Sequence, residues 1–197
     1  MSFFRHRRTA APSLPVLRTD RLVLRTFDPS DAVSVYAYAQ SEKVASMAGF
    51  APHRTLEDSR LMVEKFIETS AHWAIVEKST GRVIGSISLQ PDGRRPKLEG
   101  ARSMGYVLGE EHWGQGFATE ACRAVLRHAF EDLECPLVSA GHYPINQKSR
   151  RVLKKLGFTY EGMLRRVARF HDGTDADLLV YSLFKEEYEA QTASASR

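Results

Sequence analysis

The stretch that decides the fold reads GEEHWGQGFATEA from Gly109 to Ala121. Gly114 and Gly116 lie two residues apart, and apolar residues then recur at helical spacing, so a glycine-rich loop opens a helix. Because glycine lets the chain turn sharply, successive N–H groups of such a loop can face an anion at the positive end of the helix dipole. The stretch predicts a phosphate-binding loop, with a tight turn that holds no ligand as an equally weighted alternative.

Two other phosphate-binding patterns fit less well. The dinucleotide fingerprint needs a third glycine where Thr119 stands, and a P-loop needs a Lys-Ser or Lys-Thr pair after the glycines. A dinucleotide-binding oxidoreductase therefore stays a disfavoured alternative, and a P-loop is excluded.

Outward from the loop, hydrophobic periodicity and turn residues predict alternating short strands and helices. Strands are expected at residues 21–27, 73–77, 83–89, 103–108 and 136–143 and as a pair after 158, around a turn at His171-Asp172-Gly173; helices are expected at 28–45, 55–70, from 119 onward and at 146–156. The pattern predicts an α/β (α+β) fold with a mixed, mostly antiparallel, twisted sheet of about six to seven strands and about four helices. One domain is expected at 16–189, with a flexible basic tail at 1–15 and a flexible tail at 190–197.

Composition narrows the class of protein. The chain has 197 residues, 43% of them hydrophobic and 26% charged, with a formal net charge of +4, which suits a globular domain and any polyanionic partner. It has no apolar run of the roughly 18 to 20 residues that span a membrane and no apolar signal segment behind the basic run at 5–8. Cys122 and Cys135 belong to no cluster of metal-ligating residues, so no metal site is expected. The protein is expected to be cytoplasmic.

Several segments together resemble the GNAT superfamily of acyl-CoA-dependent N-acyltransferases, and within it the RimJ/RimL group of protein N-terminal acetyltransferases. They are LRTDRLVLR (17–25), TGRVIG (80–85), GYVL (105–108), WGQGFATEA (113–121), NQKS (146–149) and LKKLGF (153–158). The likeness covers about residues 17–187 in the expected order, and Trp113 stands where the family has Arg or Gln.

The resemblance implies that acetyl-CoA is the acyl donor and that no metal takes part. The backbone of Tyr106 to Leu108 is expected to pair with the pantetheine arm, and the amides of Gly114 to Thr119 to hold the pyrophosphate, with Trp113 contributing its N–H. The expected cofactor-binding residues are Tyr106, Val107, Leu108, Trp113, Gly114, Gln115, Gly116, Phe117, Ala118, Thr119, Asn146 and Ser149.

The catalytic residues depart from the family pattern. Leu153 stands where many members have a tyrosine acid, and Ser149 matches the substitute proposed for this group, while Asn146 would bind pantetheine or order a water. Both residues also favour helix N-termini, so a capping role can hold beside the catalytic one. Ser103 replaces the group's usual glutamate base, which leaves His142 as the candidate base, although a lone histidine is more often structural.

These observations predict direct transfer of acetyl to a primary amine. Without a strong base, an acceptor that is already neutral is favoured, so a protein N-terminal α-amine is the expected acceptor. The alternatives are an acetyltransferase for a small-molecule amine (an antibiotic or a polyamine) and a non-catalytic ribosome- or RNA-associated binding module. The expected partners are acetyl-CoA and the amine acceptor, without membrane or nucleic acid, in a monomer or homodimer.

Overall fold

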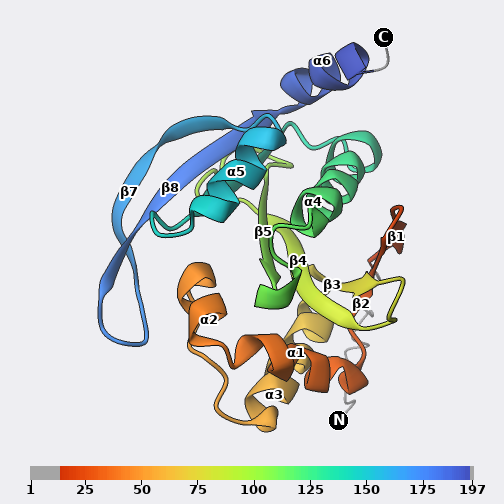
Figure 1. Cartoon of the computed structure of the whole chain (residues 1–197). Coiled ribbons are helices and arrows are strands. Elements are labelled where there is room, and N and C mark those ends of the chain that lie inside the picture. Colours follow the sequence, from red (N-terminus) through yellow and green to blue (C-terminus); the bar gives the residue numbers. More distant parts are fainter. Residues whose placement is uncertain (1–13, 196–197) are drawn as a thin grey trace, which may run out of the picture.

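One mixed sheet of eight strands organises residues 14–195, the part of the chain that the computed structural model describes (Figure 1). The strands are β1 (Leu17–Arg18), β2 (Leu22–Thr26), β3 (His72–Glu77), β4 (Val83–Pro91), β5 (Arg102–Leu108), β6 (Leu137–His142), β7 (Thr159–Arg169) and β8 (Asp175–Phe184). Their order is β1-β2-β3-β4-β5-β6-β8-β7, and every neighbouring pair is antiparallel except β5 and β6. The predicted mixed, mostly antiparallel sheet is confirmed.

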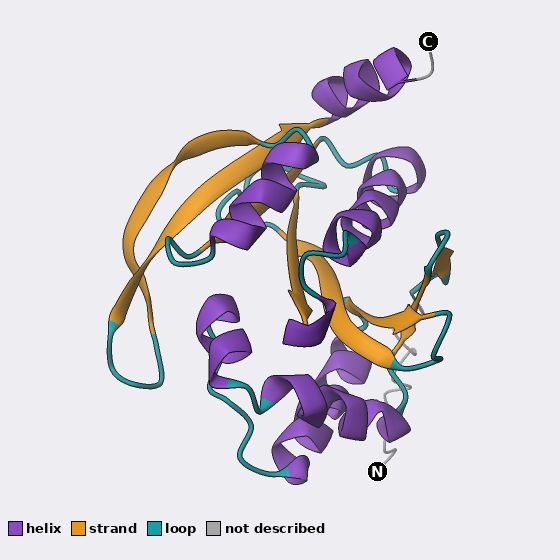
Figure 2. Cartoon of the chain, viewed as in Figure 1, coloured by secondary structure: helices purple, strands orange, loops and turns teal. Residues whose placement is uncertain are grey.

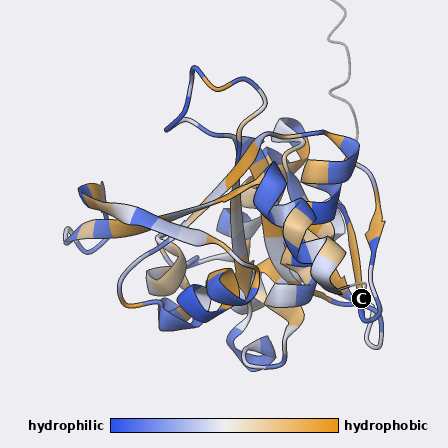
Figure 3. Ribbon diagram, turned by 90° about the horizontal axis from the view of Figure 1, so that it is seen from above, coloured by the Kyte–Doolittle hydropathy of each residue, from blue (hydrophilic) through white to orange (hydrophobic). Residues whose placement is uncertain are grey.

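Helices pack on both sides of this sheet (Figure 2). They are α1 (Ala32–Ala39), α2 (Glu42–Ala48), α3 (Leu56–Thr69), α4 (Phe117–Arg127), α5 (Gln147–Lys155) and α6 (Lys185–Ala195), with short helical turns η1 (Pro29–Asp31), η2 (Glu110–His112) and η3 (His128–Asp132). None of the helices in residues 14–195 is long and apolar enough to cross a membrane. In Figure 3 the β7–β8 hairpin projects from the rest of the molecule and carries both hydrophilic and hydrophobic residues.

Strand β3 shows why both sides of the sheet are covered. Trp73 and Ile75 belong to the apolar cluster that contains α4, whereas Ala74 and Val76 belong to the one that contains α1. Side chains alternate along a strand, so four consecutive apolar residues need a helix on each face. Full burial of a large apolar side chain contributes about 1.5–3 kcal/mol, which makes these two layers the main source of stability.

The structure differs from the expected elements at three places. The helix predicted over 28–45 divides into α1 and α2, because the Ser41 side chain accepts a hydrogen bond from the Val44 N–H and starts a new helix. The sheet gains a strand, β1, which is only two residues long. Helix α6 continues through residues 190–195, where a tail without periodicity was expected; its Ala, Glu and Gln residues favour a helix without an apolar stripe. The basic run at 5–8 lies outside the described residues.

Strands β5 and β6 separate halfway along their length. Their pairing runs only from Arg102↔Val138 to Met104↔Ala140. Beyond that point β5 stays paired with β4 as far as Leu108, and β6 stays paired with β8 as far as His142. The sheet therefore opens into a gap between two strands that are each held on their other side.

The N-terminal strands hold the start of α4 through one carboxylate. Glu120 accepts hydrogen bonds from the Thr19 hydroxyl (2.6 Å), the Arg21 N–H (2.8 Å) and the Arg21 Nε (2.7 Å). Arg21 also donates to the Gln115 carbonyl (3.0 Å) and lies over the Phe117 ring. Burial raises the pKa of Glu120, but the bonds from Thr19 and Arg21 outweigh it, so the net pKa lies below the ordinary value.

We expect Glu120→Gln to lower the free energy of unfolding at pH 7 by about 1–2 kcal/mol, because it removes a charged acceptor from three donors. Because the folded-state pKa of Glu120 lies below the ordinary value of about 4.3, the carboxylate contributes stability above that value, and this contribution is lost as the pH falls through the folded-state pKa. The difference between the variant and wild type should therefore be smaller at pH 3 than at pH 7. Urea unfolding at both pH values measures this. Glu57→Gln, which breaks an exposed pair with Arg60 on α3, is the control and should change stability little. Equal stability of Glu120→Gln and wild type at pH 7 would contradict the role of this carboxylate.

Candidate active site

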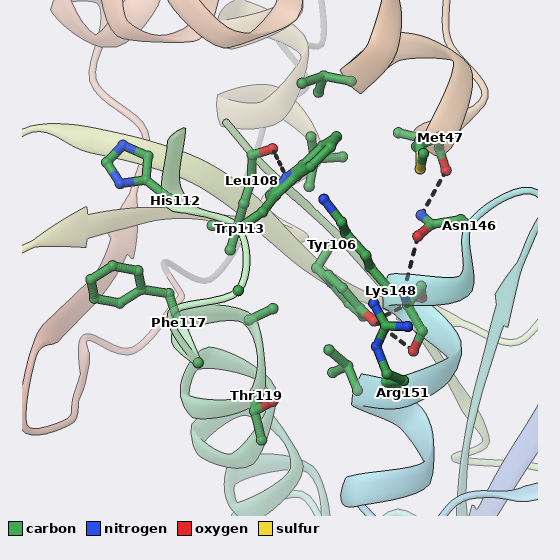
Figure 4. A pocket seen from close by; sticks show the side chains of 18 of the residues that line it. Met47, Tyr106, Leu108, His112, Trp113, Phe117, Thr119, Asn146, Lys148 and Arg151 are labelled. Carbon is green, nitrogen blue, oxygen red and sulfur yellow. Dashed lines mark hydrogen bonds between the residues drawn. The ribbon is translucent and has the colours of Figure 1, made fainter. Parts of the chain in front are cut away.

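A cavity of about 240 Å³ lies where the sheet opens, between α2, α4 and α5 (Figure 4). Eleven of the twelve predicted cofactor-binding residues line it, the exception being Gln115. The remaining lining residues were not assigned to the site from the sequence: Val44, Met47, Ala48, His112, Lys148, Arg151, Val152 and Lys155. No aspartate or glutamate is among the described residues that line this cavity.

The glycine loop presents a row of main-chain donors to the cavity. Gly114 and Gly116 have φ values of +79° and +86°, a region that L-residues with a side chain rarely adopt. With this geometry, the six amides of residues 114–119 donate to no other residue in the described part of the chain. Consecutive amides at the start of a helix, with the helix dipole behind them, form an anion-binding site.

Helix α5 adds positive charge on the opposite wall. Lys148, Arg151 and Lys155 are spaced three and four residues apart, so they share one face, and all three line the cavity. Within residues 14–195 none of them forms an ion pair. This helical spacing was visible in the sequence, but NQKS was interpreted only through Asn146 and Ser149.

The edge of β5 that faces the gap carries main-chain groups without a strand partner. The Gly109 N–H donates to the Ile84 carbonyl (2.9 Å), which sets the alternation of hydrogen bonds between β4 and β5. The N–H and C=O groups of Tyr106 and Leu108 then point toward the gap. The Leu108 carbonyl accepts from the Trp113 indole Nε1 (2.9 Å), and an extended ligand could pair with the other groups as an added strand would.

Trp113 lines the cavity through its side chain, whereas only its N–H was expected from the sequence to contribute. Its N–H donates to the Glu110 carbonyl (3.1 Å) in the turn η2, so this amide is already engaged before any ligand binds. The Lys148 ammonium lies 4.0 Å from the centroid of the indole ring, and the Lys43 ammonium lies 5.5 Å from it. The indole therefore links α2 and α5 across the cavity.

Gln115 turns away from this cavity. Its side-chain amide donates to the Glu111 carbonyl (2.7 Å), and its own carbonyl accepts from Arg21. Any contribution of Gln115 to ligand binding is then limited to its N–H.

Asn146 and Ser149 occupy the N-terminus of α5, as expected, and both line the cavity. The Asn146 side chain accepts from the Ser149 N–H (3.0 Å) and donates to the Met47 carbonyl of α2 (3.0 Å). The Tyr106 hydroxyl lies 2.8 Å from Ser149 Oγ (Figure 4). Helix capping and a position in the site thus coexist.

His142 lies outside the residues that line the cavity. It is 3% exposed and stacks on the Tyr181 ring, with Nδ1 2.8 Å from the Tyr143 carbonyl and Nε2 3.2 Å from the Tyr181 hydroxyl. The carbonyl can only accept, so Nδ1 carries the proton and Nε2 accepts from Tyr181. Burial lowers the pKa of His142, which favours this neutral form. A role as base stays a prediction, and it would need a water or a hydroxyl to reach the cavity.

The chain that forms this opened sheet and this glycine loop is an N-acetyltransferase. Residues 21–159 match the family model described as acetyltransferase (GNAT) domain, and the chain belongs to this GNAT family.

Relatives support the same family. The chain is 30% identical over 176 residues to the uncharacterized N-acetyltransferase YoaA of Bacillus subtilis, covering 87% of this chain and 97% of that one. It is 35% identical over 111 residues to YdaF of the same organism, provisionally named a ribosomal N-acetyltransferase, covering 56% and 58%.

Solved structures share the fold. A GNAT-family acetyltransferase from Bacillus anthracis superposes with a TM-score of 0.77 at 24% identity, over 88% of this chain and all of that one. The ribosomal-protein-S5-alanine acetyltransferase from Vibrio fischeri gives a TM-score of 0.73 at 23% identity, over 89% and 99%.

We expect Gly114→Ala to weaken coenzyme A binding about tenfold. A Cβ at this position meets no atom within 4 Å, so the effect comes from the positive φ, which costs an L-residue roughly 1–2 kcal/mol and moves the amides out of line. Calorimetric titration with coenzyme A measures it. Gly173→Ala in the β7–β8 turn is a matched control, since φ is +85° and the space is equally open. It should lose similar stability and keep its affinity; equal affinity in both variants would contradict the amide cradle.

Proposed function

We propose that the protein transfers acetyl from acetyl-CoA directly to a primary amine, with a protein N-terminal α-amine as acceptor, in the cytoplasm. The proposal rests on the six amides of residues 114–119. They donate to no residue in the described part of the chain, and they face the cavity that lies where the sheet opens. Family membership supports acetyl-CoA as the donor. The ribosomal acceptor named for YdaF supports a protein substrate.

The described residues fit the diphosphate and the pantetheine arm of coenzyme A. The amides of 114–119 would hold the diphosphate, and Lys148, Arg151 and Lys155 would balance the phosphate charge. The main-chain groups of Tyr106 and the Leu108 N–H would pair with the amide-containing arm. When bound, the cosubstrate supplies a thioester, whose carbonyl an amine attacks without metal or redox help.

The chain contributes mainly by placing the two reactants. Positioning is worth effective molarities of about 10⁵–10⁸ M, whereas one acid or base contributes about 10²–10⁴-fold. Asn146 fixes the start of α5, and Ser149 lies there with its hydroxyl beside the predicted thioester end of the cavity. Oriented binding should therefore outweigh any single proton-transfer group.

The lack of a carboxylate in the described lining of the cavity favours an α-amine acceptor. No aspartate or glutamate there can deprotonate an ammonium group, and the three cations of the lining are assigned to the phosphates of coenzyme A. At pH 7 an α-amine of pKa near 7.8 is roughly 14% neutral, whereas a lysine amine of pKa near 10.4 is about 0.04% neutral. The amines of a polyamine resemble lysine in having a high pKa and therefore a small neutral fraction at pH 7.

We expect acetyl transfer at pH 7 to be fastest with a neutral peptide that has a free N-terminus. The matched acceptors are the same peptide with a blocked N-terminus and one lysine, a polyamine and an aminoglycoside. Between pH 7 and pH 9 the neutral fraction rises about 7-fold for the α-amine and about 100-fold for lysine. The ratio of the transfer rate to the α-amine over that to lysine should therefore decrease as the pH rises. Thiol release and product mass measure this.

A preference for lysine, polyamine or aminoglycoside at pH 7 would overturn the acceptor assignment. Coenzyme A binding without thiol release for any amine would instead favour the non-catalytic binding module.

We expect His142→Asn to cost stability rather than turnover. The side-chain amide of the asparagine can still donate to the Tyr143 carbonyl, and the imidazole ring that the asparagine replaces does not line the cavity. Thermal unfolding and kcat/KM between pH 5 and pH 9 separate the two effects. A loss of 10²–10⁴ in kcat/KM, together with loss of the acidic limb of the pH profile, would support His142 as the base.

A further inference from the structure

The tyrosine hydroxyl nearest to Ser149 comes from a strand and not from α5. Leu153, at the α5 position where a tyrosine was looked for, is fully buried in the apolar cluster. The Tyr106 side chain enters the cavity from β5 and brings its hydroxyl within 2.8 Å of Ser149 Oγ. The motif GYVL thus contributes a side-chain hydroxyl to the site as well as a strand edge.

We propose that Tyr106 is a positioning residue for Ser149: its phenol donates to Ser149 Oγ and so directs the serine O–H to the sulfur of coenzyme A as that sulfur gains negative charge. This inference rests on the proposed function, because it needs the thiol end of coenzyme A to lie beside Ser149.

The direction of the hydrogen bond follows from the two hydroxyls. A phenol is a better donor than an alcohol and a poorer acceptor, so Tyr106 donates and Ser149 accepts. The other acceptor near the phenol, the Ser149 carbonyl, is 3.5 Å away and competes weakly. Burial raises the pKa of Tyr106, which keeps the phenol protonated. The serine proton is then left for a ligand in the cavity, and each bond strengthens the other.

The relay stabilises charge and loses no proton. As acetyl moves, the nitrogen–carbon bond forms, the carbon–sulfur bond breaks and its electron pair goes to sulfur. The proton lost by the nitrogen reaches the sulfur through water, and Tyr106 and Ser149 keep their own protons. Because a thiolate is the better leaving group when it is hydrogen-bonded, a lower thiol pKa is the expected signature of this relay.

The experiment measures the thiol pKa of bound coenzyme A from its thiolate absorbance, in wild type, Tyr106→Phe, Ser149→Ala and the double variant. We expect Tyr106→Phe to raise this pKa by about one unit, and Ser149→Ala by at least as much, since a hydrogen bond to a charged group is worth roughly that. The double variant should equal Ser149→Ala, because Tyr106 acts only through Ser149.

Other groups near the thiol stay constant in this series. His112, Lys148, Arg151 and Lys155 line the cavity, and Cys122 lies beside Tyr106. Their effect on the thiol, like that of the α5 N-terminus, cancels between variants. Tyr38→Phe is the matched control, since Tyr38 is buried and bonded to Ser86 outside the cavity, and it should leave the thiol pKa unchanged.

Replacing Tyr106 by 3-fluorotyrosine keeps the ring and tests the contact without removing the hydroxyl. Its fluorine resonance should shift as the bound thiol ionises. Three outcomes would each overturn the relay while binding and transfer persist. They are an unchanged thiol pKa in Tyr106→Phe, additive effects of the two substitutions in the double variant, and a fluorine resonance that does not shift as the thiol ionises. If wild type does not bind coenzyme A by calorimetry, the proposed function fails with it.

Discussion

The separation of β5 from β6 after Met104 and Ala140 is the constraint on which the site depends. Main-chain groups without partners cost free energy when they are buried, so such a gap persists only if both strands are held elsewhere. β4 holds β5 over its full length, and β8 holds β6. The helices that close the gap, α4 and α5, start at the glycine loop and at Asn146, so the opening of the sheet places both helix N-termini beside one cavity.

The arrangement explains the stretch at the front of the chain that resembles the GNAT family. LRTDRLVLR matched the family, but nothing in its spacing explained why Thr19 and Arg21 should matter to a loop about 95 residues later. Both residues hold Glu120, one turn inside α4, and Arg21 also holds the loop at the Gln115 carbonyl. The carboxylate sits at a helix N-terminus, where negative charge is favourable, and its donors fix the direction in which the loop amides point.

Local signals predicted most of the fold. The glycine loop, the start of the helix at Thr55 and the turn at Gly173 could be predicted because each depends on a few adjacent residues; Thr55 and Asp58 form a capping box in the structure. The residues that were missed reach the site through tertiary contact. Helix α2 joins the cavity because Asn146 bonds the Met47 carbonyl and Lys43 approaches Trp113, contacts between segments about 70 to 100 residues apart. Likewise, the two nitrogens of His142 are engaged by Tyr143 and Tyr181, which no spacing could indicate.

A hydroxyl at the thiol end can be supplied from either of two elements, and the core decides which one. α5 packs Leu153 into the apolar cluster, so a tyrosine there would need space that the sheet and α4 already fill. β5 has the freer position, because Tyr106 follows the last residue paired with β6 by two positions and its side chain lines the cavity on the face of the sheet that α4 covers. The Tyr106 phenol reaches from β5 to Ser149 at the N-terminus of α5. The hydroxyl groups of Tyr106 and Ser149 together therefore take the place of a single tyrosine side chain from α5.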